Sequence, residues 1–390
     1  MDYSIIQKMD MANIHDYIKW RGDLPINDQF PFNELDNLIL ARLSYMIYNK
    51  INMTQVETIA SISDKMKDFL NEEFIFNGDK ELITLLGMSN RFKNMIITDY
   101  VQNNDASIEQ QFSAITIHIS DSEIYVSYCG TDSSILGWKE DFNLAYMENI
   151  PAQFAGLEYI KKIASKYVNT RMHVGGHSKG GNVAIYAAIF ADESIQNRII
   201  DVVNYDGPGF DQRVLDSIPN PNIIDKITTY LPQGSIIGRL MEHKGIIFIV
   251  HSDAKGIMQH DIFSWSVMKD EFIRFYKWTN GSEIMNKSVC EWLKSTTPDK
   301  RKIFIDSIFE LLYSTSAETF NGFTKVLVQK LPTVIKTYSE LSDDDKSVMI
   351  EMLKLFIKSY YDSLKSTGVS KVKTLKINDK KNNKRGENIE

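Results

Sequence analysis

The stretch Arg171-Met-His-Val-Gly-Gly-His-Ser-Lys-Gly-Gly-Asn182 decides the fold. Its centre, Gly176-His177-Ser178-Lys179-Gly180, fits the pattern G-x-S-x-G. Residues 172–174 suit the end of a buried strand and the apolar run 183–190 suits a helix, which is the context that this pattern needs. A serine on so tight a turn has a strained backbone, and only glycines fit on either side of it. The stretch predicts a nucleophile elbow at Ser178 rather than a glycine-rich anion loop, because it contains neither a Walker A motif nor G-x-G-x-x-G.

Strands and helices alternate on both sides of this turn. The patterns predict strands at 112–119, 124–128, 199–205, 226–230 and 245–250, and helices at 151–167 and 209–217. Strands separated by helices imply crossover connections and a largely parallel sheet, and short strand pairs at the beginning and end allow a mixed one. We therefore predict the α/β class, with an α/β-hydrolase-like, mostly parallel central sheet flanked by helices.

The chain divides into four predicted segments. Residues 1–105 form a mainly helical N-terminal part of the catalytic domain, with helices at 34–48, 54–70 and 79–87, and residues 106–266 form the α/β-hydrolase core. From 267 the pattern changes to helices without a strand signal, at 283–295, 298–315, 318–337 and 342–366. We expect residues 267–367 to be an all-helical C-terminal region that packs on the catalytic body, with a lid or a surface for a protein partner as alternatives. Residues 368–390 are expected to be a disordered basic tail.

Composition narrows the class of protein. The 390 residues suffice for one large α/β domain with an appendage, and the net charge of −7 argues against a nucleic-acid surface. The tail carries seven Lys or Arg against three acids, which leaves open a peripheral contact with an anionic membrane. Cys129 and Cys290 are too far apart in the sequence to suggest a disulfide framework or a metal site. Without a signal-peptide pattern or an apolar run of ~20 residues, we expect a cytoplasmic protein, with leaderless secretion left open.

A serine nucleophile needs a histidine base and an orienting carboxylate, which follow it in the order Ser, acid, His in this fold class. His260 lies in a loop after the final predicted strand and is the preferred base, while His251 at the end of that strand is the alternative. Either could instead be a buried structural histidine.

Asp206 is the preferred acid, because it ends the strand 199–205 before a Gly-Pro turn. Asp253 and Asp261 remain rivals, since the loop after the next strand, 231–238, contains no carboxylate. Asp206 could also serve only to anchor its turn.

An oxyanion hole needs the amide after the nucleophile and a second amide from an earlier strand end. Lys179 supplies the first, and Tyr128-Cys-Gly-Thr-Asp132, followed by Trp138 and Asp141, is the candidate for the second. We expect the Lys179 side chain to be solvated. The alternative is a cation beside the oxyanion that favours an anionic acyl substrate such as a phospholipid.

The order strand, Gly-Thr, Trp-x-x-Asp, helix, Gly-His-Ser-x-Gly-Gly is similar to that of the class 3, fungal-type lipases. More closely, the chain resembles a bacterial lipase-like domain family of unknown function over about residues 10–270. The motifs that carry this likeness are Asn13-Ile-His-Asp-Tyr-Ile-Lys-Trp-Arg-Gly-Asp23, Asp36-Asn-Leu-Ile-Leu40, Gly137-Trp-Lys-Glu-Asp-Phe142, Asp206-Gly-Pro-Gly209 and Gln259-His260.

The resemblance implies Ser178 as nucleophile, His260 as base, and Thr131 with Lys179 as oxyanion donors. It also implies that Trp138 and Asp141 brace the loop beyond the hole. The chain departs from the lipases at two places: Cys129 replaces an arginine before Gly-Thr, and Gln233 and Ser235 stand where their acid lies.

These features predict a serine hydrolase, of lipase or esterase type, that cleaves carboxylic esters through Ser178, His260 and Asp206 without a metal or an organic cofactor. Its substrate would be a small-molecule or lipid ester. Two alternatives remain: a catalytically weak hydrolase-fold interaction protein whose C-terminal helices bind a partner, and a phospholipase that acts at membrane surfaces.

Overall fold

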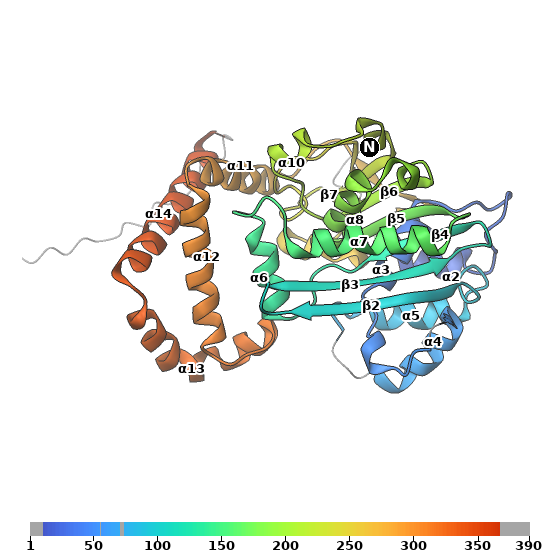
Figure 1. The fold of residues 1–390 in the computed structure, drawn as a ribbon, viewed down its shortest axis with the longest axis horizontal. Coiled ribbons are helices and arrows are strands. Elements are labelled where there is room, and N and C mark those ends of the chain that lie inside the picture. The colour runs from blue at the N-terminus through green and yellow to red at the C-terminus, as the bar shows by residue number, and fades with distance from the viewer. Residues whose placement is uncertain (1–10, 55, 71–73, 367–390) are drawn as a thin grey trace, which may run out of the picture.

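The computed structural model describes residues 11–54, 56–70 and 74–366. Its centre is a nine-stranded sheet in the order β1-β2-β3-β4-β5-β6-β7-β8-β11, with helices on both faces (Figure 1). The strands are β1 (Val56–Thr58), β2 (Ile96–Asp105), β3 (Gln110–His118), β4 (Glu123–Tyr128), β5 (Arg171–His177), β6 (Ile199–Tyr205), β7 (Ile227–Pro232), β8 (Ile246–Val250) and β11 (Arg274–Phe275). A separate pair is formed by β9 (Val267–Met268) and β10 (Glu271–Phe272).

The five central strands, β4 to β8, are parallel, and the strands beyond them at both edges pair antiparallel. The prediction of the α/β class with a mostly parallel central sheet is confirmed. The parallel arrangement puts the carboxyl ends of β5, β6 and β7 side by side, which is the edge where sites form in such sheets.

Side chains alternate along the central strands, and each face of the sheet buries its own core. Tyr125 and Tyr205 point toward the N-terminal helices, whereas Ile124 and Val202 point the other way. The second face is covered by α7 (Pro151–Lys166) and α8 (Lys179–Phe190), which lie in front of the sheet in Figure 1.

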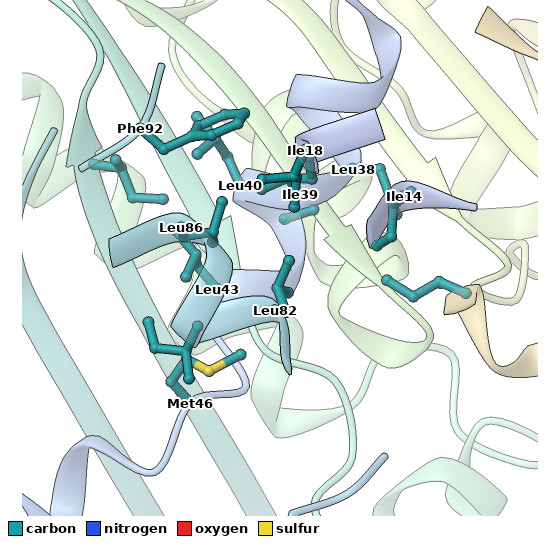
Figure 2. Packing of buried hydrophobic residues seen from close by; sticks show 14 of the residues in the cluster. Ile14, Ile18, Leu38, Ile39, Leu40, Leu43, Met46, Leu82, Leu86 and Phe92 are labelled. Carbon is teal, nitrogen blue, oxygen red and sulfur yellow. The ribbon is translucent and has the colours of Figure 1, made fainter. Parts of the chain in front are cut away.

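The first face is covered by α2 (Ile14–Arg21), α3 (Glu34–Leu43), α4 (Ile59–Met66) and α5 (Gly78–Met88). Figure 2 shows the apolar side chains of α2, α3 and α5 packed together, among them Ile18, Leu38 and Leu86. Asn33 caps α3 as the sequence predicts, because its side-chain oxygen accepts hydrogen bonds from the backbone amides of Leu35 and Asp36.

The C-terminal region consists of α11 (Asn280–Lys294), α12 (Pro298–Tyr313), α13 (Phe320–Glu340) and α14 (Asp343–Ser366), and lies beside the sheet (Figure 1). The helices agree with the predicted ones, including the start of α12 at Thr297-Pro298. This region packs on α6 (Ile135–Asn143) through an apolar cluster of Ile135, Ile305 and Phe309. The remaining short helices are α9 (Glu193–Gln196), α10 (Gln212–Asp216), η1 (Tyr48–Lys50), η2 (Lys67–Phe69), η3 (Pro221–Lys226), η4 (Gly256–His260) and η5 (Ile262–Ser264).

Three expectations about strands were wrong. The expected helix over 54–70 begins with the short strand β1, and β2 lies within the part that we expected to be helical or irregular. A register shift between Thr98 and Val101 and a polar second half hide the alternation of β2. Strands β9, β10 and β11 lie beyond residue 267, where no strand was expected; each has two residues, too few to show a period.

The expected disordered tail, 368–390, lies outside the described residues. Among the helices that the structure does describe, none combines the length and the apolar character that crossing a membrane requires.

Candidate active site

Ser178 lies at the turn between β5 and α8, at the carboxyl edge of the sheet. Its φ of 58° and ψ of −135° place it in a region that residues other than glycine rarely adopt. The strain is held in place by its neighbours, since the Ser178 amide donates to the carbonyl of Tyr205 on β6 at 2.9 Å. The geometry is that of a serine presented on a sharp strand-to-helix turn.

The glycines around Ser178 are required by close backbone contacts. A methyl group on Gly176 would lie 2.4 Å from the carbonyl carbon of Gly180, and one on Gly180 would lie 2.2 Å from the carbonyl oxygen of Tyr128. Both distances are far below van der Waals contact, so the turn can close against β4 only with glycine at these positions.

The structure brings His260 and Asp206 together. The Nδ1 atom of His260 lies 2.7 Å from Oδ2 of Asp206, which is 1% exposed. Because a carboxylate accepts, Nδ1 carries the proton, and Nε2 is the ring nitrogen that can take a proton from a hydroxyl. The other carboxylate oxygen, Oδ1, accepts the hydroxyl of Ser235 at 2.5 Å.

The backbone at Asp206 and Gly207 also lies against the turn that carries Ser178. The φ of Asp206 is 51°, again in the left-handed region, and its amide donates to the Tyr230 carbonyl at 2.9 Å. The backbone of the next residue, Gly207, lies so close to Ser178 that a methyl group on Gly207 would be 2.1 Å from the carbonyl oxygen of Ser178. The acid and the serine are therefore on adjoining backbone segments.

His177 connects the strand-to-helix turn at Ser178 to His260. Its Nε2 donates to the carbonyl of His260 at 2.9 Å, and the two rings lie 4.5 Å apart. Burial, together with the charges of His260 and Arg42, holds the pKa of His177 well below its usual range. His177 is therefore neutral near pH 7, and it positions the loop that carries His260.

The rival residues are engaged elsewhere. His251 is buried, with Nδ1 2.7 Å from the hydroxyl of Ser266, and Asp253 lies 3.7 Å from the same nitrogen. Asp261 caps the amide of Phe263. Within the described part of the chain, the ring of His260 is hydrogen-bonded to Asp206 and to neither rival.

The loop after β4 lies beside Ser178. A methyl group on Gly130 would be 3.1 Å from Cβ of Ser178 and 2.0 Å from the Tyr45 hydroxyl. Tyr45 donates to the carbonyl of His177 at 2.9 Å, so one side chain contacts both the elbow and this loop. The next residue, Thr131, donates its hydroxyl to Asp141 on α6, as expected for a brace.

The Lys179 side chain corrects two expectations. It is neither solvated nor a cation available to a substrate, because it is 1% exposed and its Nζ lies 2.6 Å from Glu140. Nζ also donates to the backbone and side-chain oxygens of Gln111, at 2.8 and 2.7 Å. Lys179 thus ties the elbow to β3 and α6, and its charge is neutralised inside the protein.

Asp141 gives a pH-dependent prediction. Burial raises its pKa from 3.8 to about 6, and its Oδ1 has no hydrogen-bond partner among the described residues. Since the pKa in the folded protein is the higher one, Asp141 favours the fold below about pH 4, and this contribution is lost as the pH rises through about 6. Asp141→Asn should therefore gain about 2 kcal/mol over the wild type between pH 4 and pH 7. Urea unfolding at pH 4 and pH 7 measures the free energies of unfolding of both proteins. If the variant and the wild type differed by the same amount at both pH values, the prediction would be contradicted.

Sequence reasoning missed Tyr45, Glu140 and Arg42, which support the elbow from distant positions. Arg42 makes two hydrogen bonds of 2.6 Å to Asp79, with both side chains fully buried, and its Nη1 lies 3.5 Å from Nδ1 of His177. All three lie inside a predicted helix or a quoted motif, but helical periodicity gives no sign of partners so far away in the sequence.

The sheet, the elbow and the adjoining His–Asp pair define a lipase-like α/β-hydrolase fold. The chain belongs to the Mbeg1-like family, a lipase-like family whose model matches residues 86–310. The match begins and ends later than the expected span of 10–270, and it includes α11.

Among solved structures, the chain is similar to one described as the crystal structure of M37 lipase. The two share 17% identity over 52% of this chain and 69% of that one, with a TM-score of 0.33. A likeness this weak carries no argument about the site. No curated protein matches the chain.

Proposed function

We propose that this protein is a serine hydrolase that cleaves carboxylic esters through an acyl-enzyme. Ser178 is the nucleophile, His260 the base and Asp206 the acid. The observation that carries the proposal is the 2.7 Å contact between His260 and the buried Asp206, beside a serine on a strained elbow. Membership in a lipase-like family supports the same class of reaction.

In the proposed mechanism, Nε2 of His260 takes the proton of the Ser178 hydroxyl while the serine oxygen attacks the acyl carbon. Asp206 holds the Nδ1 proton and stabilises the imidazolium that forms. The imidazolium gives its proton to the leaving alcohol as the ester bond breaks. A water molecule then loses a proton to His260, attacks the acyl-enzyme, and releases the acid and Ser178.

The negative oxygen that forms on the acyl carbon needs hydrogen-bond donors already in place. We assign this role to the amides of Lys179 and Thr131. The buried Lys179–Glu140 pair fixes the first, and the contact between Thr131 and Asp141 holds the second. Loss of one such donor typically costs about 10²–10³ in turnover.

The test is hydrolysis of p-nitrophenyl esters of increasing acyl length. Ser178→Ala should abolish turnover, and His260→Ala should lower kcat by at least about 10³-fold, because it removes the group that takes the serine proton. His251→Gln is the matched control for the rival base and should keep kcat within a few-fold. Thermal unfolding of each variant establishes that it is folded.

Equal turnover of wild type and Ser178→Ala would refute the proposed nucleophile. If His251→Gln lost activity and His260→Ala kept it, His251 would be the base. The acyl length with the highest kcat/KM would show whether short-chain esters or long-chain lipid esters are preferred.

A further inference from the structure

The loop after β7 is held by the first helix of the C-terminal region. Three hydrogen bonds join them: the amide of Thr279 to the carbonyl of Gln233 at 2.8 Å, the hydroxyl of Ser282 to the carbonyl of Ser235 at 2.5 Å, and the side-chain amide of Asn286 to the carbonyl of Arg239 at 2.5 Å. These contacts tie the first half of the loop, residues 233–239, to α11 and its N-cap residue Thr279.

The same loop contacts Asp206 and the residue that precedes His260. The hydroxyl of Ser235 donates to Oδ1 of Asp206 at 2.5 Å. The amide of Gly234 donates to the side chain of Gln259 at 2.8 Å, and Gln259 precedes His260. The loop thus fixes the carboxylate directly and the histidine through its neighbour.

Asp206 needs this support because of its surroundings. Its carboxylate is buried, and only one of its oxygens is bonded to His260. Without Ser235 the other oxygen would lose this donor, and a buried charge is costly unless its oxygens are hydrogen-bonded. The carboxylate could then rotate away from the ring nitrogen that it has to hold.

A series of contacts links α11 to Asp206 through Ser235. The guanidinium of Arg239 lies 4.5 Å from the ring centre of Trp278 and donates to the Ser282 hydroxyl at 3.1 Å. Ser282 donates to the backbone of Ser235, and Ser235 donates to Asp206. Two serine hydroxyls and the residue Ser235 thus connect α11 to the Asp206 carboxylate.

We propose that Ser235 is the positioning residue of the catalytic acid and that α11, through Ser282, holds Ser235 in place. The C-terminal region is therefore part of the catalytic unit and not an appendage. This inference rests on the proposed function, since it assigns Ser235 a role in the triad. The family match, which runs through α11 to residue 310, supports treating the two as one unit.

Kinetics on the p-nitrophenyl ester that the wild type cleaves best tests the proposal in the full-length chain. Ser235→Ala should lower kcat by about 10- to 100-fold, the factor that corresponds to one hydrogen bond to a charged group, with KM within about twofold. Ser235→Thr keeps the hydroxyl and should restore most of kcat. Ser282→Ala should lower kcat by a few-fold.

The matched control is Ser288→Ala, which removes a fully buried serine hydroxyl of the same helix that donates to the carbonyl of Ile284 one turn earlier. It should leave kcat unchanged. If Ser235→Ala stayed within twofold of the wild type, or if Ser288→Ala lost as much, the positioning role would be refuted.

A second measurement tests the role of Ser235 without relying on ester hydrolysis. A proton shared between His260 Nδ1 and a carboxylate gives a low-field ¹H resonance, which ¹⁵N-histidine labelling identifies. We expect the signal in the wild type and in Ser288→Ala, and its loss or shift in Ser235→Ala. If the wild type cleaved no ester but the signal was lost or shifted only in Ser235→Ala, the proposed function would fail and the positioning role would stand. An unchanged signal in Ser235→Ala would overturn the positioning role.

Discussion

Asp206→Asn is expected to lower kcat for ester hydrolysis by about 10⁴-fold, the cost of the equivalent change in a serine protease triad. The structure gives the reason. His260 donates its Nδ1 proton to Oδ2 of Asp206 at 2.7 Å, which leaves Nε2 to act as the base. An amide at this position can turn its NH₂ group toward the ring and stabilise the wrong tautomer. The loss should fall on kcat, with little change in KM.

Asp253→Asn is the control for this prediction, because Asp253 is half exposed and lies 3.7 Å from His251 in a separate cluster. Its kcat should stay within a few-fold of the wild type. Equal kcat values for Asp206→Asn and the wild type would mean that Asp206 only anchors its turn and that another carboxylate orients His260.

Lys179→Met should lower the free energy of unfolding by about 3–5 kcal/mol, the usual cost of leaving one partner of a buried ion pair alone. Lys179 and Glu140 are both at most 1% exposed, and their charged groups lie 2.6 Å apart. Removing the ammonium leaves the Glu140 carboxylate without its cation in the interior. Urea unfolding, followed by tryptophan fluorescence, measures the loss.

The double variant Lys179→Met with Glu140→Met should recover part of this loss, because no unpaired charge is then buried. Lys161→Met is the surface control, since Lys161 pairs with Glu158 at the exposed surface of α7, and it should cost less than about 1 kcal/mol. Equal losses for Lys179→Met and Lys161→Met would show that the buried pair adds nothing to stability.

The sequence was most informative where the chemistry is local. The elbow needs glycines two positions before and after Ser178, and the contacts of Gly176 and Gly180 show why no other residue fits. The chain order of nucleophile, acid and base then restricted the choice to a few residues, and the preferred pair, Asp206 and His260, lies in hydrogen-bond contact.

Contacts between distant segments could not be predicted in this way. Lys179 meets Gln111, 68 positions earlier in the chain, and Tyr45 meets His177 across 132 positions. Lysine and tyrosine are both common residue types in helices, so the local sequence around Lys179 and around Tyr45 gives no sign of the distant partner. The lysine therefore looked solvated, although it is among the most deeply buried residues.

The contact of Ser235 with Asp206 is another one that the sequence could not predict. The sequence shows only that residues 231–238 contain no carboxylate, where the lipases that the chain resembles carry their acid. The structure shows that the serine at this place donates to Asp206 on the neighbouring strand. The departure from the lipase pattern is thus accompanied by a direct contact with the candidate acid.

Labelling with a fluorophosphonate probe, followed by mass spectrometry of the modified peptide, tests the central claim most directly, because the probe reacts with an activated serine whatever the natural ester is. We predict one modified residue, Ser178, no labelling of Ser178→Ala, and much slower labelling of His260→Ala. Absence of labelling in the wild type, or a modified serine other than Ser178, would contradict the claim that this elbow carries an active nucleophile.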